Sequence, residues 1–128
     1  MSDNCPFCTL KYNPVRAESE LTLFLRDGFP VSPGHTLVVP GRHVASFFEV
    51  TETGQVELMT ALAAAKEVLD REFSPDSYNV GINDGPAAGQ SVPHVHIHLI
   101  PRYSGDSEEP GGGVRWLFPE KADYWSMA

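Results

Sequence analysis

The sequence predicts an α+β fold in which one long helix packs on an antiparallel β-sheet. Four short apolar runs bounded by Gly, Pro or Asp predict strands, and one long amphipathic run predicts a helix. Strands joined by loops, with a single dominant helix, favour an antiparallel sheet. The 128 residues, 41% hydrophobic and 20% charged, are expected to form one globular domain.

The expected strands cover residues 21–26, 35–39, 78–83 and 93–101. The expected helix begins after the N-cap Thr51 and continues to residue 73, where Pro75 and Asp76 stop it. Its apolar residues at helical spacing are Val56, Met59, Leu62, Ala63, Val68, Leu69 and Phe73.

Three further segments complete the expected organisation of the chain. Residues 1–20 show no sustained period, and a short helix or turn is expected over residues 43–48. Residues 104–128 are expected to form a loop and an aromatic tail, which packs on the domain or on a partner subunit.

Composition and charge exclude several classes of function. The net charge of −8 argues against nucleic-acid binding, because phosphate backbones require clustered Lys and Arg. A small phosphorylated substrate remains compatible, since a few imidazoles and amides supply local positive potential. The acidic run at residues 106–109 is expected to be a solvated loop. No apolar run reaches the length of about 18 residues that a membrane span needs. The N-terminus has no basic stretch followed by an apolar core, so we expect a cytoplasmic protein.

Three of the five histidines, His94, His96 and His98, alternate with branched apolar residues. In a strand, this alternation would place all three imidazoles on one face, with neighbours about 7 Å apart. Imidazole can attack phosphorus, transfer protons or bind metal near neutral pH. The pattern therefore indicates a functional site rather than a solvated strand face.

A loop rich in Gly and Ala, residues 83–91, leads directly into the histidine run. Such a loop can turn its backbone N–H groups toward an anion without side-chain obstruction. Its position would bring Gln90 and Ser91 beside the imidazoles, and Asn83 could reach the same place.

These segments resemble the histidine triad (HIT) family. The motif His-φ-His-φ-His-φ-φ, with φ apolar, spans His94 to Ile100, and residues 33–40 and 89–92 also match. The resemblance implies an antiparallel sheet with a long helix, usually a homodimer whose sheet extends across subunits, and a purine nucleotide on the sheet surface. It further implies hydrolysis or transfer at the α-phosphate of a nucleoside phosphoramidate, dinucleoside polyphosphate or similar ester, with no organic cofactor.

The resemblance also assigns roles to individual residues. His96 would attack the α-phosphorus and form a nucleotidyl-imidazole that water hydrolyses, while an acceptor holds its other nitrogen protonated. His98 and His35 would donate to phosphate oxygens or the leaving group, and His94 is the remaining catalytic candidate. Asp27 matches the position that binds ribose hydroxyls, although Asp-Gly alone is typical of a turn. The other substrate-binding candidates, which would orient the phosphate, are Asn83, Gly89, Gln90 and Ser91.

Cys5 and Cys8 have the C-x-x-C spacing of a zinc site or a redox dithiol. A redox motif normally follows a strand, and no strand is expected before residue 5. Zinc needs two further ligands, for which His43 and His94 are available. Many bacterial-type HIT proteins resemble this pattern and carry structural zinc, which would assign His94 to the metal rather than to catalysis. A disulfide or free thiols are the alternatives.

Two other functions remain open. One is a metal enzyme with His35, His94, His96 and His98 as ligands of zinc or iron, although no carboxylate is obviously placed to join them. Asp84 is separated from the histidines by the Gly-rich loop and is not obviously placed to join them. The other is a non-catalytic nucleotide-binding module, because a fold does not fix a function.

Overall fold

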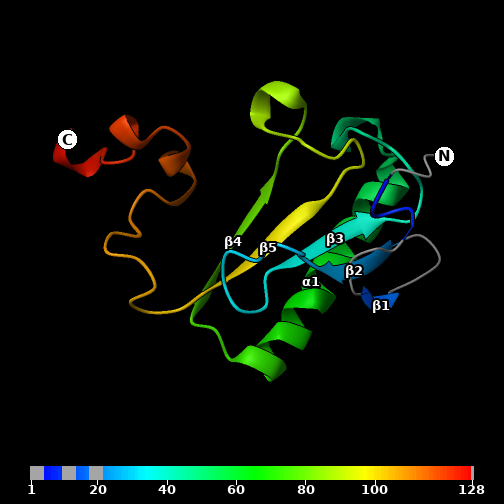
Figure 1. The fold of residues 1–128 in the computed structure, drawn as a ribbon, viewed down its shortest axis with the longest axis horizontal. Helices are drawn as coiled ribbons and strands as arrows, with labels where there is room; N and C mark the ends of the chain where they lie inside the picture. The colour runs from blue at the N-terminus through cyan, green and yellow to red at the C-terminus, as the bar shows by residue number, and fades with distance from the viewer. Residues whose placement is uncertain (1–4, 10–13, 18–21, 128) are drawn as a thin grey trace.

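A five-stranded sheet and one long helix form the two main layers of the protein (Figure 1). The computed structural model describes residues 5–9, 14–17 and 22–127. Every strand pair is antiparallel, in the order β1-β2-β3-β5-β4, which confirms the predicted α+β class. The strands are β1 (Pro14–Ala17), β2 (Thr22–Arg26), β3 (Thr36–Pro40), β4 (Ser77–Ile82) and β5 (Ile97–Arg102).

Helix α1 (Glu52–Phe73) begins and ends as the sequence predicts. The Thr51 hydroxyl accepts a hydrogen bond from the Gly54 N–H at 3.0 Å, which caps the first turn. Ser74 ends the helix in the left-handed conformation, with φ of 48°, directly before Pro75. The short 3₁₀ helices are η1 (Phe47–Glu49), η2 (Pro86–Ala88), η3 (Gly113–Leu117), η4 (Pro119–Lys121) and η5 (Trp125–Met127).

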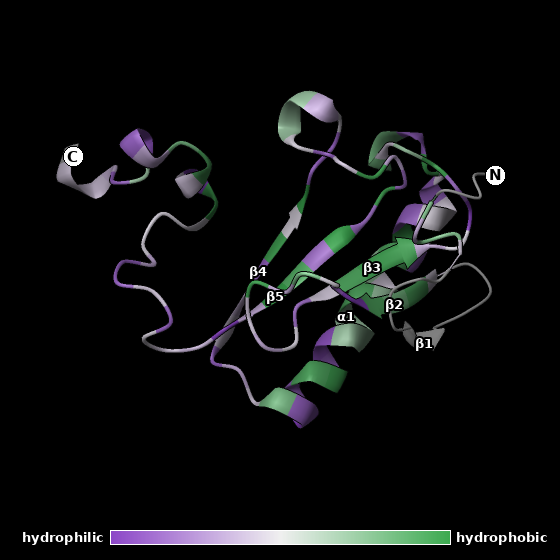
Figure 2. Ribbon diagram, in the orientation of Figure 1, coloured by the Kyte–Doolittle hydropathy of each residue, from purple (hydrophilic) through white to green (hydrophobic). Residues whose placement is uncertain are grey.

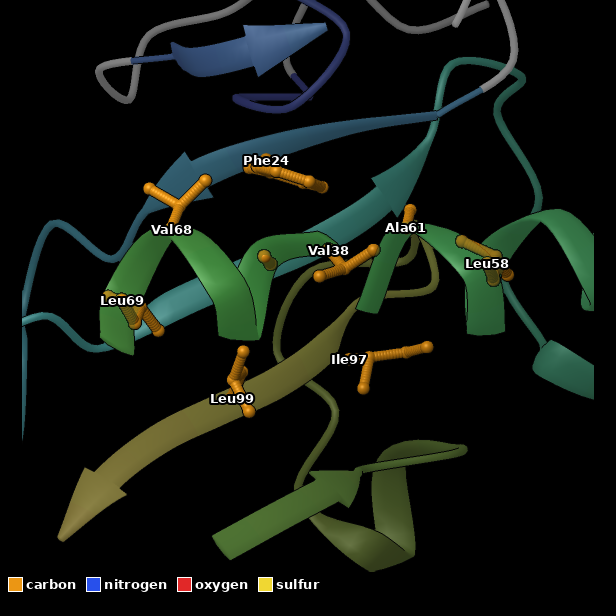
Figure 3. Packing of buried hydrophobic residues seen from close by; sticks show 9 residues of the cluster. Phe24, Val38, Leu58, Ala61, Val68, Leu69, Ile97 and Leu99 are labelled. Atoms are coloured by element: carbon orange, nitrogen blue, oxygen red, sulfur yellow. The ribbon is translucent and has the colours of Figure 1, made fainter. Parts of the chain in front are cut away.

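The main core lies between α1 and one face of the sheet (Figure 3). The helix contributes Leu58, Ala61, Ala65, Val68 and Leu69, and the sheet contributes Phe24, Val38, Ile97 and Leu99. Three residues of the predicted apolar face are instead solvent-exposed: Val56 at 64%, Met59 at 44%, and Ala63. The buried face of the helix includes Ala61 and Ala65, which a search for large apolar residues overlooks.

The opposite face of β2 and β3 carries a second apolar cluster, formed by Cys5, Phe7, Leu25, Leu37 and Val39. Strand β3 is therefore buried along its whole length and is hydrophobic throughout its centre (Figure 2). With α1 on one face and the cysteine segment on the other, β3 is the common support of both clusters.

The prediction that His94, His96 and His98 all lie in one strand is wrong. Strand β5 begins at Ile97 rather than at residue 93, so only His98 of the three lies in the sheet. The β3–β5 pairing ends at Ile97, and the next N–H groups bond elsewhere: Val95 donates to Val44 and His94 to Val92. Pro93 also removes a donor that a strand would use. The chain thus bends before the strand, while the His96 and His98 ring centroids remain 5.1 Å apart.

The remaining strands lie within one residue of their predicted bounds, although Leu21 falls outside the described residues. Strand β1 was not predicted; it is short, and its pairing with β2 shifts register between Pro14 and Arg16. None of the described helices combines the length and the apolar composition that crossing a membrane requires.

We expect Leu69→Ala to lower the free energy of unfolding by about 2–4 kcal/mol, because it leaves a cavity beneath the helix. Met59→Ala is the matched control on the same helix and should cost less than about 1 kcal/mol, since Met59 is 44% exposed. Urea unfolding measures both changes. Equal losses would contradict this assignment of the helix faces.

Candidate functional site

His96 is held with one ring nitrogen bonded and the other available. Its Nδ1 lies 2.9 Å from the backbone oxygen of His94. A carbonyl only accepts, so Nδ1 carries the proton and Nε2 keeps a lone pair. This is the arrangement that a nucleophilic imidazole needs, and the acceptor is two residues away in the chain. The His96 side chain is nearly buried, at 7% exposure, and its ring centroid lies 5.1 Å from that of His98.

His35 and His98 form a directed pair. The Val31 N–H donates to His35 Nδ1 at 3.2 Å, so neutral His35 carries its proton on Nε2. That Nε2 lies 2.9 Å from His98 Nδ1, which accepts and leaves the His98 proton on Nε2. The sequence predicted direct donation to substrate from both residues. In the structure, His35 Nε2–H instead donates to His98 Nδ1.

Asp27 lies at the same pair and also forms a turn. Its Oδ1 accepts from the Phe29 N–H at 2.8 Å, and its Oδ2 lies 3.4 Å from His35 Nε2. The expectation that no carboxylate accompanies the histidines is therefore wrong, since Asp27, His35 and His98 could surround a cation. However, the proton on His35 Nε2 occupies the position a metal would take, which weakens that interpretation.

The surroundings keep these imidazoles neutral. Burial lowers the pKa of His98 to about 4, with like charge on His96 and His35 acting in the same direction. Burial also lowers the pKa of His35, against the opposing effect of the Asp27 carboxylate. The pair therefore works as a set of oriented N–H donors rather than as fixed cations.

Residues 83–91 form a self-bonded turn. The N–H groups of Gly85, Ala88, Gly89 and Gln90 all donate within the loop. The Gln90 side chain accepts from Gly85 and donates to the carbonyls of Ala45 and Val92. The prediction that these amides face an anion does not hold for those four groups, and Gln90 acts as a brace of the loop.

The other predicted phosphate-orienting residues lie at the two ends of this loop. Asn83 lines the neighbouring cleft, and its Nδ2 is 4.0 Å from where a Cβ on Gly89 would lie. Gly89 adopts a φ of +90°, which side chains rarely tolerate. Ser91 is solvent-exposed at the loop end.

Cys5, Cys8, His43 and His94 gather into one group that could hold a metal ion. His94 Nδ1 lies 3.5 Å from both sulfurs, and His43 Nδ1 lies 3.1 Å from the Cys8 sulfur. Ligands around tetrahedral zinc would have N···S separations of about 3.5 Å. His94 Nε2 lies 2.8 Å from the Pro40 carbonyl, so Nε2 carries the proton and Nδ1 is free to ligate. The donor set fits zinc. The rest of the predicted segment 1–20, beyond residues 5–9 and 14–17, lies outside the described residues.

A cleft of about 660 Å³ lies beside the His35–His98 pair. Strands β4 and β5 form its floor, and Val114 and Leu117 of η3 line it from the tail. His96 is not among its lining residues, but its ring centroid lies 5.1 Å from that of His98, which does line the cleft. Figure 1 shows the tail projecting beyond the β4 edge of the sheet.

Sequence reasoning missed several residues of this region. The tail was not expected to meet the site, yet two of its apolar residues line the cleft. Most of its large side chains are exposed, including Phe118 at 64%, and are not packed on the domain. The carbonyl of Pro40 and the N–H of Val31 are backbone groups, which no residue-type signal reveals. Phe7, inside the C-x-x-C motif, contacts two of the three histidines.

The chain belongs to the HIT domain family, whose pattern matches residues 11–105. It is 42% identical over 80 residues to the asymmetrical bis(5'-nucleosyl)-tetraphosphatase of Schizosaccharomyces pombe, covering 62% of this chain and 44% of that protein. It is 37% identical to a bis(5'-adenosyl)-triphosphatase of Saccharomyces cerevisiae, covering 84% of this chain and 50% of that protein. The chain thus corresponds to half or less of each of these two relatives.

The fold matches a solved structure along nearly its whole length. The crystal structure of a HIT family member from Bacillus subtilis superposes with a TM-score of 0.75 at 31% identity, covering 98% of this chain and 94% of that one. The sheet order and the single long helix described above are therefore those of the family.

Acid should destabilise the protein through His98. Its native pKa of about 4 lies below the ordinary value of 6.5, so between these values the unfolded chain binds a proton that the native state does not. Stability present above pH 6.5 is then lost as the pH falls toward 4. The loss from this residue should be on the order of 2 kcal/mol. His98→Asn removes this part of the dependence. Urea unfolding across this pH range measures it, and equal pH slopes in both proteins would refute the assignment.

Proposed function

We propose that the protein is a nucleotide hydrolase or nucleotidyl transferase that acts at the α-phosphate through a nucleotidyl-His96 intermediate. The observation that carries this proposal is the hydrogen bond from His96 Nδ1–H to the His94 carbonyl, which leaves Nε2 as a fixed lone pair. Phosphoryl transfer depends mainly on such positioning and on charge stabilisation.

In the first step, the Nε2 lone pair of His96 forms an N–P bond while the bond from phosphorus to the leaving group breaks. In the second step, a water oxygen attacks phosphorus, the N–P bond breaks, and its electron pair returns to Nε2. The water protons pass to the released phosphate and solvent. The His94 carbonyl stabilises the positive charge that develops on the ring, because it accepts from Nδ1–H throughout.

His98 is the donor that faces the cleft, with its proton on Nε2. It would donate to a phosphate oxygen or to the leaving oxygen. A polyphosphate leaving group departs as an anion and needs hydrogen bonds more than a proton, which suits a neutral imidazole of low pKa. His35 is then a positioning residue that fixes the His98 tautomer.

Dinucleoside polyphosphates are the substrates best supported, because the names of two relatives specify them. Nucleoside phosphoramidates are the other class to be tested. Asp27, with its Oδ2 beside His35, remains the candidate for the ribose hydroxyls. Asn83 and Ser91 remain the candidates that orient the phosphate.

We further propose that Cys5, Cys8, His43 and His94 hold a structural zinc ion. When bound, zinc would cross-link the N-terminal segment to the bend before β5 and take no part in the reaction. This assigns His94 to structure. A homodimer also remains a proposal: β4 is an edge strand of the sheet, and Val56 and Met59 leave an apolar stripe exposed on α1.

A metal enzyme is the second candidate, favoured by the grouping of Asp27, His35 and His98. It is less well supported, because the Val31 N–H favours the His35 tautomer that cannot ligate through Nε2. A non-catalytic nucleotide-binding module is the third candidate, and it predicts no covalent adduct on His96.

His96→Ala should lower turnover of a diadenosine polyphosphate or an adenosine phosphoramidate by on the order of 10³-fold or more. Intact-protein mass spectrometry of rapidly quenched reactions should detect a nucleotidyl adduct on the wild type and none on the variant. An unchanged urea midpoint controls for folding. Turnover that survives in the variant would exclude the covalent mechanism, and an unreactive wild type would favour the binding module.

The wild-type protein should retain one zinc ion per chain after dialysis, and Cys8→Ser should weaken zinc binding by at least about 100-fold. Competition with a chromophoric chelator measures the affinity. His98→Asn is the matched control and should keep the metal, because His98 lies in the other cluster. Failure of the wild type to hold zinc, or loss in both variants alike, would count against this site.

A further inference from the structure

Phe7 lies between the two cysteines and contacts both a predicted metal ligand and the predicted nucleophile. Its ring centroid is 5.0 Å from that of His96, with 66° between the planes. It is 5.7 Å from that of His94, with 88° between the planes. Only 4% of Phe7 is exposed, so the ring fills space that solvent does not enter.

Three directed contacts with described residues restrain the His96 ring. One is the hydrogen bond from Nδ1 to the His94 carbonyl, and the others are edge contacts with Phe7 and with His98 at 5.1 Å. A single hydrogen bond contributes only about 1 kcal/mol net, so an imidazole with empty space beside it can turn away from its acceptor and lose the tautomer that the acceptor fixes. Packing at the side of the ring must therefore set the direction in which Nε2 points.

We infer that Phe7 is a positioning residue for His96. Its ring holds the imidazole in the orientation that keeps Nδ1 on the carbonyl and Nε2 available. Because Phe7 lies between Cys5 and Cys8, the orientation of the His96 ring depends on the position of that segment. Displacing a nucleophile by about 1 Å can cost on the order of 100-fold in rate, so a packing residue of this kind acts on the reacting atom without touching substrate. The kinetic part of this inference rests on the proposed function.

Phe7→Leu tests the inference, with Val39→Ala as the matched control. Val39 is fully buried in the same apolar cluster, on strand β3. Phe7→Met replaces Phe7→Leu if that variant does not fold. Three measurements are made on the zinc-loaded full chain: the His96 tautomer by long-range ¹H–¹⁵N NMR of the ring, the zinc content, and kcat and KM for a diadenosine polyphosphate.

The expected result is a His96 ring that exchanges between tautomers in the Phe7 variant and holds one tautomer in wild type and Val39→Ala. Zinc content and KM should stay unchanged, while kcat falls by about tenfold or more in the Phe7 variant alone. The inference is overturned if His96 keeps a single tautomer in the Phe7 variant. It is also overturned if the kcat loss equals that of Val39→Ala or follows loss of zinc.

The NMR comparison separates this inference from the proposed function. If the wild type shows no turnover, the proposed function fails, and the His96 tautomer alone decides whether Phe7 positions the ring.

Discussion

The hydrogen bond from His96 Nδ1 to the carbonyl of His94 is the constraint on which the site depends. It exists because the chain bends between Val92 and Ile97 instead of running as a strand. In a regular strand, the His94 carbonyl would point along the sheet toward a neighbouring strand and accept a ladder hydrogen bond there. Because of the bend, the described residues between Val92 and Ile97 form no ladder hydrogen bonds with β3. In return, the His94 carbonyl fixes the tautomer of His96.

The same bend divides the histidines between two chemical environments. His94 turns its Nδ1 toward two sulfurs, whereas His98, already in β5, turns toward His35 and the cleft. Strand β3 contacts the residues of both environments. Its residues are buried throughout, its last carbonyl, on Pro40, orients His94, and Leu37 pairs with His98 across the sheet. This buried central strand therefore sets the distance between the cluster of Cys5, Cys8, His43 and His94 and the His35–His98 pair.

Sequence alone predicts the parts of this protein whose signals are local. The helix from Glu52 to Phe73 follows from its cap, its period and Pro75, and the metal group follows from ligand spacing. The sequence could not reveal that the strand begins only at Ile97, because His94 and Val95 still follow the alternation expected of a strand. What breaks the strand is competition for backbone partners. The His94 N–H bonds locally to Val92 beside Pro93, whereas the Val95 N–H bonds to the distant Val44, which is tertiary information. The exposed Val56 and the cleft-lining Leu117 were missed for the same reason: burial depends on what lies opposite.

Electrostatics constrains how the acidic chain could bind the anionic substrate proposed for it. With a net charge of −8, the protein offers no broad positive field, and burial holds His98 and His35 neutral. Attraction must then come from oriented N–H groups whose directions are fixed before the substrate arrives, at no cost of reorganisation. A phosphate beside His98 raises the pKa of that imidazole, because an anion favours the protonated ring. The proposed phosphate site therefore offers oriented N–H donors rather than fixed positive charge.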